Sequence, residues 1–97
     1  ERRANLGGTW DLFRYPGIRS DSDMHTLGFA FEPWKHEKSI ADGPAILDYL
    51  NRIVDERGIR DKIVFDTKVI AADWRSDEAC WHVTVERGGK RETMTAN

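Results

Sequence analysis

The sequence predicts a fold of the α/β class, and within these 97 residues it predicts an α+β arrangement. Three patterns support this prediction. Apolar residues repeat at helical spacing between Pro44 and Gly58. Three later runs alternate apolar and polar side chains, as antiparallel strands do. A short apolar run lies between these two parts, and a helix that leads into a lone buried strand indicates a larger parallel sheet.

The helix has the clearest signals. Pro44 suits a first helical turn, because that position needs no backbone N–H donor, and Gly58 suits a C-terminal cap. The expected core-facing residues between them are Ile46, Leu47, Leu50, Ile53 and Val54. Ile63-Val64-Phe65 follows after a charged turn and predicts the short, parallel-type strand.

The last third of the chain predicts a three-stranded antiparallel meander. Arg75–Glu78 and Gly88-Gly89 supply the two turns. The expected strands are Thr67–Trp74, Cys80–Glu86 and Lys90–Ala96. Residues 1–43 are instead rich in Gly, Pro, Asp and aromatic residues without a sustained period, which predicts a loop-rich segment with at most short helical turns.

Composition narrows the functional classes. The chain has 97 residues, 39% of them hydrophobic and 33% charged, which is typical of one globular domain or part of one. The net charge of −2 argues against nucleic acid as a partner. Cys80 has no second cysteine with which to form a disulfide, which favours a reducing compartment and hence the cytoplasm.

No metal site is expected from the sequence. His25, His36 and His82 lack metal-ligand spacing, and no paired cysteines accompany them. The start at Glu1-Arg2-Arg3 shows neither an initiating methionine nor a targeting pattern. We therefore expect the chain to be an internal part of a longer protein.

The stretch from residue 7 to residue 21 carries the functional signal. Its paired glycines, Gly7-Gly8, allow a backbone to approach a flat or phosphorylated ligand, and Trp10 adds an aromatic wall. Tyr15-Pro16-Gly17 predicts a tight turn, after which Arg19 and Asp21 offer polar contacts. A packed surface loop without a ligand is the alternative reading of the same composition.

This stretch resembles a motif of Baeyer–Villiger monooxygenases: Ala/Gly-Gly-x-Trp, four residues, Phe/Tyr-Pro-Gly/Met, three residues, and Asp. Gly7-Gly8-Thr9-Trp10, Tyr15-Pro16-Gly17 and Asp21 match every defined position. Residues 22–29 and 31–34 are similar to the continuation in the bacterial branch that includes ethionamide-activating monooxygenases. The resemblance implies that residues 1–97 are part of an FAD-binding Rossmann-type domain, with residues 1–43 contacting the cofactor and residues 44–97 supplying helix, strand and meander.

The resemblance also implies roles for six residues in binding FAD or NADPH. Glu1 corresponds to an acidic residue that binds the adenosine ribose. Gly8, Thr9 and Trp10 are expected to pass along the FAD. Asp21 matches the closing aspartate, which in relatives lies near the flavin and pairs with an arginine from later in the chain, and Arg19 is a candidate contact for the NADPH phosphate.

The glycine fingerprint for the FAD pyrophosphate does not occur in these residues, and we expect it upstream of Glu1. No catalytic residue is assigned, and the chain is expected to be inactive alone. The intact protein is expected to use NADPH and FAD to insert oxygen into a small ketone. The alternatives are a flavin-containing N- or S-oxygenase acting on a heteroatom, and a small non-catalytic interaction domain that self-associates through exposed strand edges.

Overall fold

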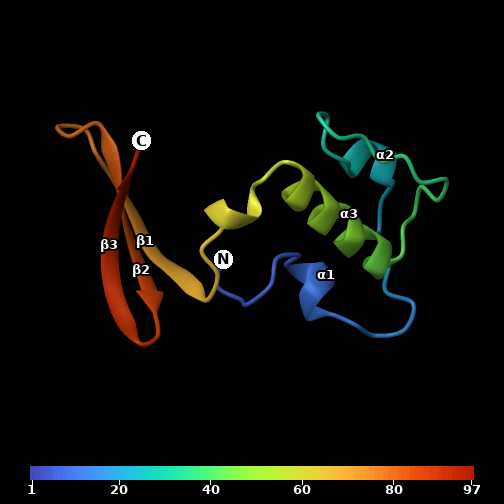
Figure 1. Ribbon diagram of the computed structural model, residues 1–97, viewed down its shortest axis with the longest axis horizontal. Coiled ribbons are helices and arrows are strands. Elements are labelled where there is room, and N and C mark those ends of the chain that lie inside the picture. The colour runs from blue at the N-terminus through green and yellow to red at the C-terminus, as the bar shows by residue number, and fades with distance from the viewer. The chain divides into compact units, whose positions relative to one another are not determined.

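A computed structural model describes all the residues from Glu1 to Asn97, and the contacts of the chain divide it into two units. Residues 6–60 form a helical unit, and residues 1–5 together with 61–97 form a β unit. Figure 1 shows the helices of the first unit and the strands of the second. None of the helices is long and apolar enough to cross a membrane.

The helical unit is organised around α3, Gly43–Glu56. Pro44 lies in its first turn, as predicted, and the chain leaves the helix through Gly58, which has a φ of 60°. The buried core gathers on one face of α3 and on the loops that cover it, and it comprises Met24, Trp34, Ala41, Ile46, Tyr49 and Ile53. The helix itself is therefore confirmed. Of its five expected core-facing residues, only Ile46 and Ile53 belong to the buried core, and Leu50 packs against it partly buried, whereas Tyr49 was not expected there.

The rest of this unit is loop with two short helices, α1 at Thr9–Leu12 and α2 at Met24–Leu27. This matches the expected loop-rich segment. Asp23 caps α2 by accepting a hydrogen bond from the backbone N–H of His25 at 2.8 Å. The Asp23 side chain also accepts a hydrogen bond from the Thr26 hydroxyl, and these bonds, with that of Thr26 the largest cause, lower the pKa of the Asp23 carboxyl.

Tyr49 fixes the turn between residues 29 and 32 to α3. Its hydroxyl accepts a hydrogen bond from the backbone N–H of Phe29 at 2.9 Å and donates one to the carbonyl of Glu32 at 2.6 Å. Arg52 of α3 and Arg57, the residue that follows the helix, hold the Glu32 carboxylate at 3.2 Å and 3.4 Å. These charges lower the pKa of Glu32, and the hydrogen bond from Arg52 is the largest cause.

The β unit contains the predicted meander. Strands β1 (Thr67–Arg75), β2 (Cys80–Arg87) and β3 (Lys90–Ala96) pair antiparallel in the order β1-β2-β3. Gly88 and Gly89 connect β2 and β3 with φ values of 56° and 75°, as a two-residue hairpin turn of type I′ requires. Trp74 and Trp81 face each other across β1 and β2 with ring centroids 5.5 Å apart.

The predicted strand at Ile63-Val64-Phe65 is not formed, and this part of the prediction is wrong. Residues 60–62 form a short 3₁₀ helix, η1, and residues 63–65 enter no strand ladder. The carbonyl of Val64 accepts a hydrogen bond from the backbone nitrogen of Glu1 at 2.9 Å instead. A parallel strand needs a neighbouring strand for its hydrogen bonds, and the only strands described form the antiparallel meander.

The two tyrosines provide a matched test of this packing. We expect Tyr49→Phe to lower the free energy of unfolding by about 1–2 kcal/mol, because it leaves the Phe29 N–H and the Glu32 carbonyl without their partner. Tyr15→Phe should change it by less than about 0.5 kcal/mol, because the Tyr15 side chain is 61% exposed. Urea unfolding of the two variants measures both values, and equal losses would contradict the role assigned to Tyr49.

Candidate functional site

The candidate site begins at the paired glycines. Gly7 and Gly8 have φ values of 118° and 52°, in the region that side chains disfavour. A Cβ atom at Gly7 would collide with the side chain of Leu47 on α3, whereas a Cβ atom at Gly8 would meet nothing within 4 Å. Gly7 is therefore required for packing, and the backbone at Gly8 is open to the approach of another group.

Tyr15-Pro16-Gly17 forms the predicted turn. The backbone N–H of Ile18 donates a hydrogen bond to the carbonyl of Tyr15 at 3.2 Å, and Gly17 has a φ of 81°. This is the geometry of a type II turn, with proline and glycine at its central positions. The turn reverses the chain after α1 and brings Ile18 back toward α3.

Hydrogen bonds then fasten the loop to the start of α3. Gly43 N–H donates to the Ile18 carbonyl at 2.8 Å, and Ser20 N–H donates to the Ala41 carbonyl at 2.8 Å. The buried hydroxyl of Ser20 accepts from Ala41 N–H at 3.0 Å. A Cβ atom at Gly43 would lie 2.9 Å from the Ile18 side chain, so only glycine allows this close approach.

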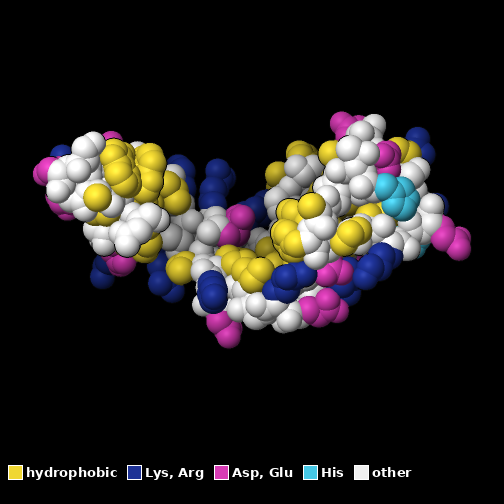
Figure 2. Space-filling model, turned by 90° about the horizontal axis from the view of Figure 1, so that it is seen from above, with side chains coloured by type: hydrophobic (Ala, Val, Ile, Leu, Met, Phe, Trp, Pro, Cys, Tyr) yellow, Lys and Arg dark blue, Asp and Glu magenta, His cyan; other side chains and the backbone are white.

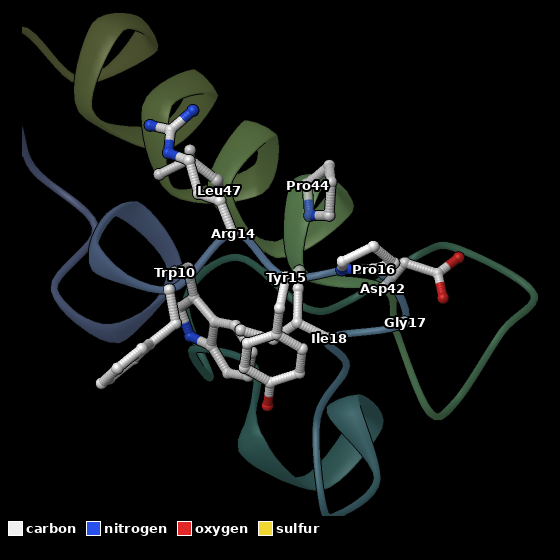
Figure 3. A pocket seen from close by; sticks show the side chains of 11 residues that line it. Trp10, Arg14, Tyr15, Pro16, Gly17, Ile18, Asp42, Pro44 and Leu47 are labelled. Atoms are coloured by element: carbon white, nitrogen blue, oxygen red, sulfur yellow. The ribbon is translucent and has the colours of Figure 1, made fainter.

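The fastened loop and α3 enclose a groove of ≈ 460 Å³. Figure 3 shows Trp10 from α1, Tyr15 and Ile18 from the loop, and Pro44 and Leu47 from α3. Its full lining is Trp10, Phe13, Arg14, Tyr15, Pro16, Gly17, Ile18, Asp42, Gly43, Pro44 and Leu47. The groove is mostly apolar and has the size of a small-molecule pocket.

A second hollow of ≈ 420 Å³ shares four lining residues with this groove: Trp10, Phe13, Tyr15 and Ile18. It brings together four of the six predicted site residues: Thr9, Trp10, Arg19 and Asp21. Gly8 directly precedes them and caps α1 through its backbone alone. Glu1 belongs to the β unit, where its carboxylate accepts a hydrogen bond from the backbone N–H of Arg3 at 2.9 Å.

Charged groups lie at the rim of both hollows. The Arg14 guanidinium donates to the buried carboxylate of Asp11 at 2.6 Å and to the Asp11 carbonyl at 3.0 Å, so Arg14 is held against α1. Arg19 and Asp21 are exposed. Lys38 donates to Asp42 at 2.8 Å and lowers the pKa of that carboxyl, with a smaller contribution from the charge of Arg19.

The sequence pattern did not reveal the part of the groove that α3 supplies. Pro44 was assigned to the first helical turn and Leu47 to the core-facing side of the helix, and Asp42 was assigned no role. Their position in the groove follows from the attachment of Ile18 and Ser20 to α3, which joins residues more than 20 positions apart. The exposure of Leu12 and Phe13 depends on this tertiary arrangement, and no local pattern in the sequence indicates it.

Apolar side chains remain exposed on both units. Figure 2 shows patches of hydrophobic side chains interrupted by charged ones. In the helical unit, Phe13 and Tyr15 line the groove and are exposed, as is Leu12, which precedes them in the chain. In the β unit the exposed large side chains include Trp74, Trp81 and Met94. Apolar patches bordered by charged side chains are typical of faces that contact a ligand or another part of a protein.

Known monooxygenases are similar to this chain in sequence. No family profile matches the chain. It is 57% identical over 97 residues to an FAD-containing monooxygenase, EthA, from Mycolicibacterium smegmatis, and 50% identical over 98 residues to a probable FAD-binding monooxygenase, AlmA, from Acinetobacter baylyi. Both alignments cover the whole chain. The chain is therefore similar, along its whole length, to a segment of FAD-containing monooxygenases.

Solved structures of monooxygenases share the fold of the chain. A steroid monooxygenase bound to NADP matches 99% of it with a TM-score of 0.82 and 31% identity. A cyclohexanone monooxygenase from Rhodococcus bound to NADP⁺ matches 99% with a TM-score of 0.78 and 33% identity. The chain also matches OTEMO, a protein solved in complex with FAD and NADP, at a TM-score of 0.73 over 98% of its residues and 31% identity.

These comparisons confirm the resemblance to Baeyer–Villiger and flavin-containing monooxygenases that the motif indicated. The chain spans about a fifth of the length of the curated relatives, 20% in both cases given, and 18–19% of the solved chains. The FAD-containing monooxygenases thus contain a segment with this sequence pattern and this fold.

The two glycines at the start of the site should respond differently to substitution. We expect Gly7→Ala to lower the free energy of unfolding by about 2 kcal/mol or more, since its Cβ atom displaces Leu47 and its backbone is strained. Gly8→Ala should cost about 1 kcal/mol, from backbone strain alone. Urea unfolding compares them, and a Gly8→Ala loss as large as that of Gly7→Ala would show that the packing at Gly7 is misassigned.

Proposed function

We propose that the protein containing this chain is an NADPH- and FAD-dependent monooxygenase, and that residues 7–21 form part of its FAD-binding surface. The observation that supports this most directly is the second hollow, in which Thr9, Trp10, Arg19 and Asp21 converge. These are the motif residues and their neighbours, and the sequence of the whole chain follows that of FAD-containing monooxygenases. Bound FAD and NADPH would supply the redox chemistry that activates oxygen.

The residues at this surface fit a flavin dinucleotide. Trp10 offers an aromatic face beside the open backbone of Gly8, where no side chain stands in the way. The hydroxyl of Thr9, at the start of α1, can donate to a phosphate or ribitol oxygen. The carboxylate of Glu1 suits the two hydroxyls of the adenosine ribose, and we include it in the proposed FAD contacts on the family resemblance.

Arg19 and Asp21 have separate proposed roles in the second hollow. Asp21 would pair with an arginine from another part of the protein and hold that guanidinium beside the reacting centre, where it can stabilise negative charge. The exposed guanidinium of Arg19 would contact a phosphate of NADPH. Neither residue exchanges a proton with substrate in this proposal, and no catalytic residue is assigned to the chain.

The proposed substrate is a small ketone, into which oxygen is inserted beside the carbonyl. The name of one structural relative, a cyclohexanone monooxygenase, favours a ketone over an isolated amine or sulfide. We also propose that the chain is part of a Rossmann-type domain in a cytoplasmic enzyme. The outer edges of β1 and β3, which have no ladder partner in this chain, would pair with other strands.

The complete protein provides the test of this function. It should purify with about one FAD per chain and oxidise NADPH in the presence of a cyclic ketone and oxygen. Asp21→Asn should retain FAD but lower the rate of ketone oxygenation by about tenfold or more, because the arginine loses its ionised partner. Asp77→Asn, in the turn between β1 and β2, is the matched control and should leave the rate unchanged.

Two results would count against the proposal at different levels. A complete protein that neither holds FAD nor consumes NADPH would overturn the proposed function. A normal rate in Asp21→Asn, with FAD bound, would remove only the role given to Asp21.

The 97-residue chain by itself should bind FAD weakly or not at all. It presents one wall of the proposed site, and an incomplete contact surface cannot offset the entropy lost on binding. Titration of FAD with the chain, followed by flavin fluorescence, should show no saturable quenching at chain concentrations of about 1–10 μM. Saturable binding in that range would show that these residues contain most of the FAD site.

A further inference from the structure

Strand β2 and the turn before it bring together three side chains with metal-binding atoms. Cys80 and His82 are two positions apart on β2, so their side chains project from the same face of the strand. Glu78 lies in the turn that leads into the strand and folds back over this face. One potential ligand atom from each residue lies within 4.8 Å of the other two.

The distances show how tightly the three groups are clustered. His82 Nε2 lies 2.7 Å from an oxygen of the Glu78 carboxylate, and Cys80 Sγ lies 3.9 Å from the same oxygen. Cys80 is 8% exposed, and His82 is half-buried. The thiol and the imidazole are therefore held by the sheet, whereas the Glu78 side chain, 52% exposed, is free to rotate.

We propose that Glu78, Cys80 and His82 bind a divalent transition-metal ion of the zinc class. Thiolate, imidazole and carboxylate are the three ligand types that Zn²⁺ takes from proteins, and three protein ligands leave a fourth position for water. A thiolate disfavours Mg²⁺ and Ca²⁺, which prefer sites made of oxygen ligands. The thiolate and the carboxylate together neutralise the charge of the ion.

Binding requires one small rearrangement. In a tetrahedral site with bonds of about 2.0–2.3 Å, neighbouring ligand atoms lie about 3.3–3.8 Å apart. The distance of 3.9 Å between Cys80 Sγ and the Glu78 oxygen already suits this geometry, whereas that of 2.7 Å between Glu78 and His82 must lengthen. Rotation of the exposed Glu78 side chain achieves this, and the thiol proton is released to solvent as the ion binds.

The surrounding charges limit the affinity without preventing binding. Arg75 is the partner of Cys80 across the β1–β2 ladder and carries a positive charge near Glu78. Asp73 is the ladder partner of His82 and carries a negative charge.

The sequence predicted no metal site, and this proposal differs from that prediction. The expectation rested on the absence of paired cysteines and of ligand spacings known from zinc fingers. Cys-x-His matches no such spacing, but in a strand it places both side chains on one face. The turn at residues 76–79, in which Ala79 has a φ of 49°, then adds the third ligand.

Cobalt provides the test, in the complete FAD-loaded protein. Titration with Co²⁺ should give one saturating set of absorption bands in the red, beyond the range of oxidised flavin, as tetrahedral coordination with a thiolate produces. Zn²⁺ should displace the cobalt and abolish these bands. Cys80→Ser and His82→Gln should each weaken Co²⁺ binding by about 100-fold or more, since each removes one of three protein ligands.

Two further variants keep the test decisive. Glu78→Gln changes an exposed turn residue, so it should leave the fold and the FAD content intact while weakening Co²⁺ binding by about tenfold or more. Glu86→Gln, on the same face of β2 but outside the cluster, should change the affinity by less than about twofold. Absence of the red bands at millimolar Co²⁺, or equal affinities in wild type and Cys80→Ser, would overturn the proposal.

Discussion

The candidate site depends on the hydrogen bonds that tie residues 18–20 to residues 41–43. The bonds from Gly43 N–H to the Ile18 carbonyl and from Ser20 N–H to the Ala41 carbonyl are both 2.8 Å long, and they lie at the buried start of α3. Without them, the turn at Tyr15-Pro16-Gly17 would be a free loop. With them, Trp10 and Tyr15 form a fixed wall of the groove. Releasing the loop would leave buried backbone N–H and C=O groups without hydrogen-bond partners, which is unfavourable.

The core beneath this attachment explains why α3 can serve as a support. Its buried face, with Ile46, Tyr49 and Ile53, packs against Met24 from α2 and against Trp34 and Ala41 from the loops. Ala41 is thus both a core residue and a hydrogen-bond partner of Ser20. The same packing that stabilises the unit therefore positions the loop, and a substitution in this core is expected to affect stability and the groove together.

Local signals in the sequence were sufficient for the elements that form through local interactions. Helix α3 follows from its apolar period and Pro44, and the meander follows from its alternation and from Gly88-Gly89. The strand at 63–65 was predicted wrongly, because its hydrogen bonds require a neighbouring strand that the described residues do not supply. The motif indicated the resemblance to monooxygenases and pointed to four of the residues that line the second hollow. The contribution of α3 to the groove and the convergence of Glu78, Cys80 and His82 depend on tertiary structure.

The central claim is that the stretch from Gly7 to Asp21 lies against FAD. A crystal structure of the complete protein, grown with FAD, measures this most directly. The account predicts that Trp10 and the backbone of Gly8 contact the dinucleotide, with the loop still fastened to α3 as it is here. A structure in which FAD binds elsewhere, with this loop exposed to solvent or packed against protein alone, would contradict it.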